Sequence, residues 1–249
     1  MCTVVLLLRP GADWPVLIAA NRDEMLDRAW DPPAAHWPER PGIVGGRDCL
    51  AGGTWMALNR HGVVATVLNR QGSLGPRADK ESRGELPLIA LAEPTAAAAA
   101  AAIGALDAGR WRRFNMVLAD GVDAFFLRGL GEGHPHVERL APGLAMVTAH
   151  NPNDHESPRV ARHLPRFAAA SPPQPPAEWA SWTAILADRS GPPESQLTIA
   201  PRGGFGTVCA ALLALRPDGA PVWLFAPGPA DQAAFAFVAP PGGPAGANG

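Results

Sequence analysis

Apolar residues in the amino-terminal part of the chain form short runs separated by turn residues. Residues 4–9, aliphatic up to the closing Arg9, and the aliphatic residues 16–20 flank a Pro-Gly-Ala-Asp turn, which predicts an antiparallel hairpin. These runs are nearly continuous rather than alternating, so we expect both faces of the strands to be covered. A second hairpin is predicted where residues 52–59 and 63–69 flank an Arg-His-Gly turn. Residues 31–46, rich in Pro, Gly and Trp, are expected to form an irregular loop.

The rest of the chain alternates helical patterns with further strands. Residues 82–106 are alanine-rich, which predicts one or two helices divided at Pro94. Apolar residues at helical spacing predict two more helices within residues 159–169 and 179–186. Further strands are expected at 115–120, 124–128, 144–148, 208–215, 222–225 and 235–238.

This order of elements is typical of an α+β protein with two mainly antiparallel sheets stacked between helical layers. The proline-rich segment 171–176 is the weakest point of the chain, but too few strands follow it to form a sheet of their own. We therefore expect one domain over residues 1–239. The Gly- and Pro-rich segment 240–249 is expected to be a disordered tail.

Composition narrows the classes of function. The chain has 249 residues, of which 47% are hydrophobic, and a formal net charge of -2, so it can bury a large core and has no basic footprint for nucleic acid. The apolar run at residues 3–8 is too short to span a membrane and has no signal-peptide features. We expect no membrane span and a cytoplasmic location. The oligomeric state stays open.

Cys2 is the residue most suggestive of chemistry. The three cysteines are widely spaced and odd in number, which argues against disulfides and a structural zinc site and leaves buried small hydrophobes as the default. If Met1 is removed, Cys2 carries a thiol of pKa about 8.5 beside an α-amine of pKa about 7.7–8.0. One residue then supplies a nucleophile and its base. The alternative is that Cys2 merely follows the start codon.

The tetrad Asn-Arg-Asp-Glu at residues 21–24 ends the second predicted strand. An antiparallel hairpin brings Arg22 or Asp23 within reach of Cys2. A carboxylate there can hold the α-amine, and a guanidinium can stabilise a thiolate. A solvated ion-pair cluster is the alternative.

Two asparagines, Asn69 and Asn151, each follow an apolar strand. Acyl transfer needs donors aimed at the oxygen that becomes negative, and amide groups supply them. Both residues are equally explained as turn residues, above all Asn151, which precedes Pro152.

Histidine chemistry is the rival interpretation. His150 and His155 lie near acidic residues, but their spacing matches no zinc motif. We expect His61 in a hairpin turn and His134 and His136 in a loop. No P-loop or dinucleotide fingerprint occurs.

Taken together, these motifs resemble those of the NRDE family, also called the Transport and Golgi organisation protein 2 family. The resemblance rests on Met-Cys at the start, the tetrad at 21–24, the segments 52–59, 67–69 and 82–84, and His150-Asn151. That family is similar to N-terminal-nucleophile hydrolases of the choloylglycine hydrolase and penicillin V acylase type. The resemblance implies a four-layer αββα fold with Cys2 as nucleophile, Asp23 orienting its amine, Asn69 facing substrate and Asn151 in the oxyanion hole.

The chain departs from the acylase pattern at two positions. The acylases carry an arginine ahead of the asparagine, where this chain has Ala20, and its own arginine, Arg22, follows. Relatives commonly have an arginine after Gly-Thr in the last sheet, whereas here Val208 follows Thr207. Arg202, in the preceding loop, is a candidate substitute.

Two functions follow from this resemblance. The first is an amidohydrolase without cofactor, cleaving a small-molecule, non-peptide amide with Cys2, Arg22, Asp23, Asn69 and Asn151. The second is a non-catalytic carrier of a hydrophobic ligand, because family members are implicated in haem trafficking, lipid homeostasis and Golgi organisation. Haem or an acyl-CoA would then contact Cys2, a histidine such as His61, or the tryptophan-rich loops.

Overall fold

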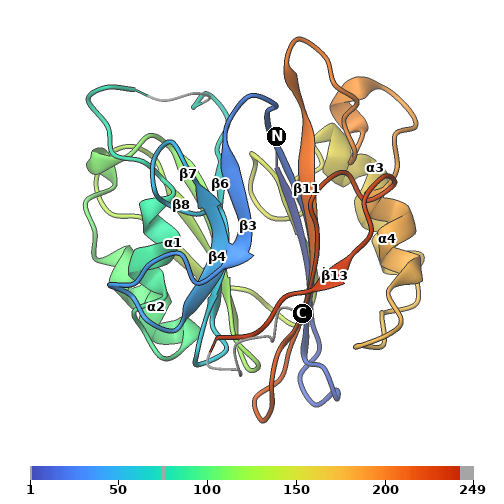
Figure 1. Ribbon diagram of the computed structural model, residues 1–249, viewed down its shortest axis with the longest axis horizontal. Coiled ribbons are helices and arrows are strands. Elements are labelled where there is room, and N and C mark those ends of the chain that lie inside the picture. Colours follow the sequence, from blue (N-terminus) through green and yellow to red (C-terminus); the bar gives the residue numbers. More distant parts are fainter. Residues whose placement is uncertain (1, 74–76, 242–249) are drawn as a thin grey trace, which may run out of the picture.

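Two antiparallel sheets face each other in the computed structural model, which describes residues 2–73 and 77–241 (Figure 1). Part of the expected tail, residues 242–249, lies outside the described residues. Within them, the first sheet has the order β10 (Gly143–Val147), β1 (Thr3–Leu8), β2 (Val16–Met25), β11 (Phe205–Leu215), β12 (Val222–Ala226) and β13 (Ala236–Phe237). The second has the order β3 (Trp30–Ala34), β4 (Ile43–Asp48), β5 (Met56–Asn59), β6 (Val64–Asn69), β7 (Phe114–Ala119), β8 (Ala124–Gly129) and β9 (His136–Arg139).

Helices cover the outer face of each sheet, so the predicted αββα sandwich is confirmed. Figure 1 shows α1 (Glu85–Ala90) and α2 (Ala96–Gly104) outside the second sheet, and α3 (Pro158–Ala169) and α4 (Ala180–Leu186) outside the first. Two short 3-10 segments, η1 (Ala108–Arg110) and η2 (Pro193–Ser195), join these layers to the strands. Pro94 separates α1 from α2, as the sequence predicts.

Three apolar clusters fill the spaces between the four layers. The central cluster lies between the sheets and includes Leu6, Ile18, Leu58 and Phe126. The outer two lie between each sheet and its helices. Strands β1 and β2 contribute to both the central and one outer cluster, which explains their nearly continuous apolar runs.

The prediction of an irregular loop over residues 31–46 is wrong in part, because β3 and β4 begin or end inside it. The prolines of β3, Pro32 and Pro33, fall where its register with β4 is irregular, on an edge strand of the second sheet. Proline is tolerated on a sheet edge because the outer side of an edge strand has no partner strand, so a missing N–H there costs no hydrogen bond within the sheet. The other edge strand, β9, begins at His136, which was expected in a loop.

No helix among the described residues combines the length and the apolar character that crossing a bilayer requires.

Candidate functional site

Cys2 lies beside the end of β2, where the hairpin prediction places it. Thr3 pairs with Asn21 in β2, so Cys2 faces Arg22 across the hairpin. Its thiol lies 3.7 Å from the backbone oxygen of Asp23, to which it donates. The side chain is half-buried, and this burial raises the pKa of the Cys2 thiol above its ordinary value. Near neutral pH the group is therefore a thiol, and it needs a base to become a nucleophile.

The carboxylate of Asp23 is buried and held from two sides. Thr207, opposite Asp23 in β11, donates its hydroxyl to Oδ1 at 2.6 Å. The Arg159 guanidinium, from α3, lies 2.8 Å from Oδ2 and also donates to the Thr3 hydroxyl at 3.0 Å. The predicted closeness of Asp23 and Cys2 is confirmed, and the carboxylate is fixed on the far side of the backbone from solvent.

Sequence reasoning missed Arg159 and Thr207. Arg159 occupies the buried face of α3 together with Val160, His163 and Phe167. A cation on the apolar face of an amphipathic helix requires a buried partner, and this signal points to a carboxylate in the sheet below.

Arg22 points to the other side of the strand and lines a cavity with Cys2. Its guanidinium lies 4.3 Å from the ring centroid of Trp55 and 3.6 Å from the Glu24 carboxylate. Only 6% of the Arg22 side chain is exposed, and its Nη1 has no hydrogen-bond partner among the described residues. A buried donor of this kind has unused capacity for a ligand oxygen.

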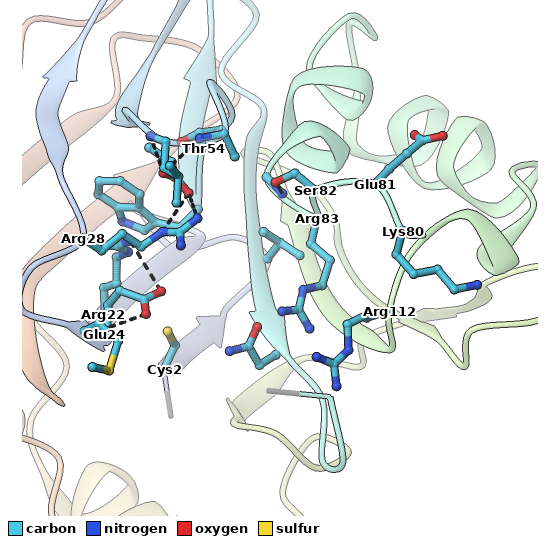
Figure 2. Close-up of a pocket in the computed structure, with 18 of the residues that line it drawn as sticks. Cys2, Arg22, Glu24, Arg28, Thr54, Lys80, Glu81, Ser82, Arg83 and Arg112 are labelled. Atoms are coloured by element: carbon cyan, nitrogen blue, oxygen red, sulfur yellow. Dashed lines mark hydrogen bonds and ion pairs between the residues drawn. The ribbon is translucent and has the colours of Figure 1, made fainter. Parts of the chain in front are cut away.

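The cavity has a volume of about 540 Å³, and its wall includes the last residues of β2 in the first sheet and of β4 and β6 in the second. Figure 2 shows Cys2 between Arg22 and Glu24 on one side and Arg83 and Arg112 on the other. Asn69, the last residue of β6, also lines this cavity. The apolar part of its wall consists of Met25, Leu50, Ala51, Trp55, Val67 and Phe205.

A close backbone contact holds the segment that carries Arg83 against the second sheet. The Thr54 amide donates to the Gly84 oxygen at 2.8 Å. A Cβ added to Gly53 would lie 2.4 Å from the Gly84 carbonyl carbon. This contact gives a physical reason for glycine in both the 52–54 and 82–84 motifs, because a side chain would separate the two segments.

Asn151 and Arg202 do not line the cavity formed by the described residues. The Asn151 Oδ1 accepts from Arg70 at 3.0 Å and from Arg128 at 3.2 Å. Arg202 is exposed, and its backbone pairs with Phe205. The structure therefore brings together Cys2, Arg22, Asp23 and Asn69, and it leaves Asn151 engaged in a separate arginine cluster.

The described residues contain no group of three or more His, Cys, Asp or Glu side chains placed to hold a metal ion. His150 takes part in the structure through its backbone oxygen, which accepts from Asn115 at 2.7 Å. His61 lies in the β5–β6 turn, next to Arg60.

Two solved structures similar to this chain are an amidase ortholog and a penicillin V acylase. The N-acylethanolamine-hydrolyzing acid amidase ortholog of Caenorhabditis elegans superposes with a TM-score of 0.60 at 11% identity, covering 96% of this chain and 100% of its own. Penicillin V acylase from Agrobacterium tumefaciens gives a TM-score of 0.51 at 14% identity, covering 91% and 83%. At these identities the likeness shows the fold alone.

The chain belongs to the Transport and Golgi organisation 2 family, whose model matches residues 1–214. The resemblance drawn from the motifs is thereby confirmed. Among curated proteins, no match was found.

Proposed function

We propose that this protein is an N-terminal cysteine amidohydrolase that cleaves a small-molecule, non-peptide amide. The observation that carries the proposal is the placement of Cys2 at a cavity of about 540 Å³, with the Asp23 carboxylate fixed behind it. A cavity of this size suits a small-molecule substrate. The two similar structures are named as an amidase and an acylase, which supports the same class of reaction.

Removal of Met1 frees the α-amine of Cys2, which takes the proton of the raised-pKa thiol. The sulfur then attacks the amide carbon, forming a C–S bond and a negatively charged oxygen. Asp23 orients the amine. Arg22 and Asn69, both in the cavity wall, donate to that oxygen.

The intermediate collapses when the protonated α-amine gives its proton to the leaving nitrogen and the C–N bond breaks. Water, deprotonated by the same amine, hydrolyses the thioester and restores the thiol. The products are one carboxylic acid and one amine. Asn151, which the resemblance assigns to the oxyanion hole, has no step in this scheme, because it lies outside the cavity wall with its Oδ1 bound by Arg70 and Arg128.

The test compares Cys2→Ala with Cys49→Ala on a panel of N-acyl amides. Cys49 is exposed and lies outside the cavity wall, so it is a matched control. Intact mass establishes that Met1 is absent from every protein assayed, because alanine at position 2 is as small as cysteine and permits its removal equally. We expect Cys2→Ala to lose about 10³-fold or more in kcat and Cys49→Ala to stay within about twofold. Undiminished turnover by Cys2→Ala contradicts the proposal.

Carriage of a hydrophobic ligand is the second candidate. It is favoured by Met25 and Leu50, which line the cavity and are 42% and 74% exposed. Haem, titrated into the protein, should then give a shifted Soret band that changes in Cys2→Ala if the thiol binds iron. An acyl-CoA should instead quench the fluorescence of Trp55 in the cavity wall. Absence of both signals at micromolar protein argues against carriage of these ligands.

A further inference from the structure

The cavity next to Cys2 has walls of different character. Its apolar wall is formed by Met25, Leu50 and Phe205, whereas Lys80 and Arg83 belong to the opposite wall. Figure 2 shows Lys80, Arg83 and Arg112 on the side of Cys2 away from Arg22 and Glu24. A ligand that fills this space therefore meets an apolar surface at one end and positive charge at the other.

Most of the charged side chains around the cavity are already paired. Arg28 lies 2.6 Å from Asp48, and Arg77 lies 2.6 Å from Asp79. The Glu81 carboxylate is bound by Arg110, outside the cavity wall, at 2.8 Å. These pairs neutralise each other and leave little net charge for a ligand.

Lys80 and Arg83 are different, because their hydrogen-bond partners are neutral oxygens. Lys80 donates to the Gly109 oxygen at 2.5 Å. Arg83 Nη1 donates to the backbone oxygens of Ser73 and Arg113 at 2.8 and 3.1 Å. Among the described residues, no carboxylate forms an ion pair with either cation.

The Arg83 guanidinium is also in an environment that disfavours its own charge. Burial, together with the nearby positive charge of Arg112, lowers the pKa of Arg83 to about 10. A cation that is desolvated and faces another cation gains most when an anion arrives, since the anion relieves both effects.

We propose that the substrate is an amide between an apolar acyl group and an amine that carries a carboxylate or phosphate, with this anionic group bound by Arg83. This inference rests on the amidohydrolase function proposed above and names its substrate class. The acyl chain lies along Met25, Leu50 and Phe205, and the anionic end lies at Arg83. The scissile carbonyl is then between the two walls, next to Cys2.

Two matched pairs of amides test the proposal. N-decanoylglycine and N-decanoylglycinamide differ by a carboxylate charge, and N-decanoylethanolamine phosphate and N-decanoylethanolamine differ by a phosphate. We expect kcat/KM for the charged member of at least one pair to exceed that for its neutral partner about tenfold, as one charge-assisted contact provides. The pair that shows the preference identifies the anion. Equal values within both pairs contradict the proposal.

Variants then test which residues supply the preference. Arg83→Gln should reduce the charged-to-neutral ratio severalfold, whereas Arg83→Lys should retain most of it. Arg139→Gln is the control, because Arg139 is an exposed arginine in β9 outside the cavity wall, and its ratio should not change. Arg83→Met, which also removes the charge, keeps the test decisive if Arg83→Gln does not fold. An unchanged ratio in every folded variant overturns the assignment.

Binding to Cys2→Ala separates this inference from the proposed function. Calorimetry with the same four amides needs no turnover, and we expect the charged member to bind about tenfold more tightly. If the native chain turns over none of the amides but the charged members still bind more tightly, only the amidohydrolase function is contradicted. Turnover without any charge preference contradicts only the inference about the substrate.

Discussion

Asp23 shows how a single residue of the site depends on distant parts of the chain. Its carboxylate is bound by Thr207, 184 positions away, and by Arg159 in α3. Burying a carboxylate is costly unless a cation and hydrogen bonds compensate for the lost water. The position of the Cys2 backbone, whose thiol contacts the Asp23 oxygen, therefore depends on a helix in a different layer.

Replacing Arg159 by methionine removes the cation and keeps most of the side-chain volume. We expect Arg159→Met to lower the free energy of unfolding by about 3–5 kcal/mol, because Asp23 loses its guanidinium partner. Urea denaturation measures the change. Arg162→Met is the control on the same helix: Arg162 is 34% exposed and lies 3.8 Å from Asp188, so we expect about 1 kcal/mol or less. Equal losses in the two variants would show that the buried pair has no special weight.

At the scale of elements, the site depends on two glycine-containing segments that touch. One connects β4 to β5 and contains Gly53; the other precedes α1 and contains Arg83 and Gly84. Their contact is made by the backbone. The proposed anion-binding wall is thereby fixed relative to the β4–β5 connection, which also carries Trp55.

Gly53→Ala should displace the segment that carries Arg83. The added Cβ would lie 2.4 Å from the Gly84 carbonyl carbon, so the backbone must move. We expect a loss of about 1–3 kcal/mol in unfolding free energy, as for other overpacked sites, and a lower charged-to-neutral ratio of kcat/KM.

Gly52→Asn is the control for this prediction. Gly52 has a φ of 73°, and a Cβ added there would meet no atom within 4 Å. Asparagine tolerates that backbone conformation better than most other residues, so its effect on both measurements should be small. A Gly53→Ala variant that behaves like Gly52→Asn would contradict the proposed role of the contact.

At the scale of the whole molecule, local patterns predicted the layers better than they predicted the contacts between them. The hairpins β1–β2, β5–β6 and β7–β8 and the helices α1 to α4 follow from periodicity and turn residues within short windows. The strand β3 was missed because its two prolines resemble a loop, although they are tolerated at a sheet edge.

The site was predictable where it depends on sequence neighbours. One hairpin brings Cys2, Arg22 and Asp23 together, so their closeness follows from the β1–β2 register. Arg159 contacts Thr3 across 156 positions, and no local pattern encodes that distance. Asn151 follows an apolar strand as Asn69 does, but its amide oxygen is bound by arginines from β8 and from the end of β6, which depends on tertiary packing.

The outer helical layer on the first sheet should make the whole fold sensitive to acid. His163, on the buried face of α3, donates from Nε2 to the Ser195 oxygen in η2 at 2.8 Å, and Arg166 donates to its Nδ1 at 3.0 Å. This arrangement requires a neutral ring. Burial is the largest cause that lowers the pKa of His163, to about 4.

The unfolded chain, in which histidine has a pKa of about 6.5, binds a proton more readily than the folded chain at this residue. The stability that His163 contributes is therefore fully present above pH about 6.5 and is lost as the pH falls towards 4. Between pH 7 and pH 5 we expect the native protein to lose about 2 kcal/mol of unfolding free energy through this residue. His163→Gln should lack this loss in urea denaturation at both pH values, whereas His155→Gln, at an exposed histidine, should retain it. If His163→Gln loses as much stability as the native chain over this interval, the neutral buried ring does not anchor α3 to η2.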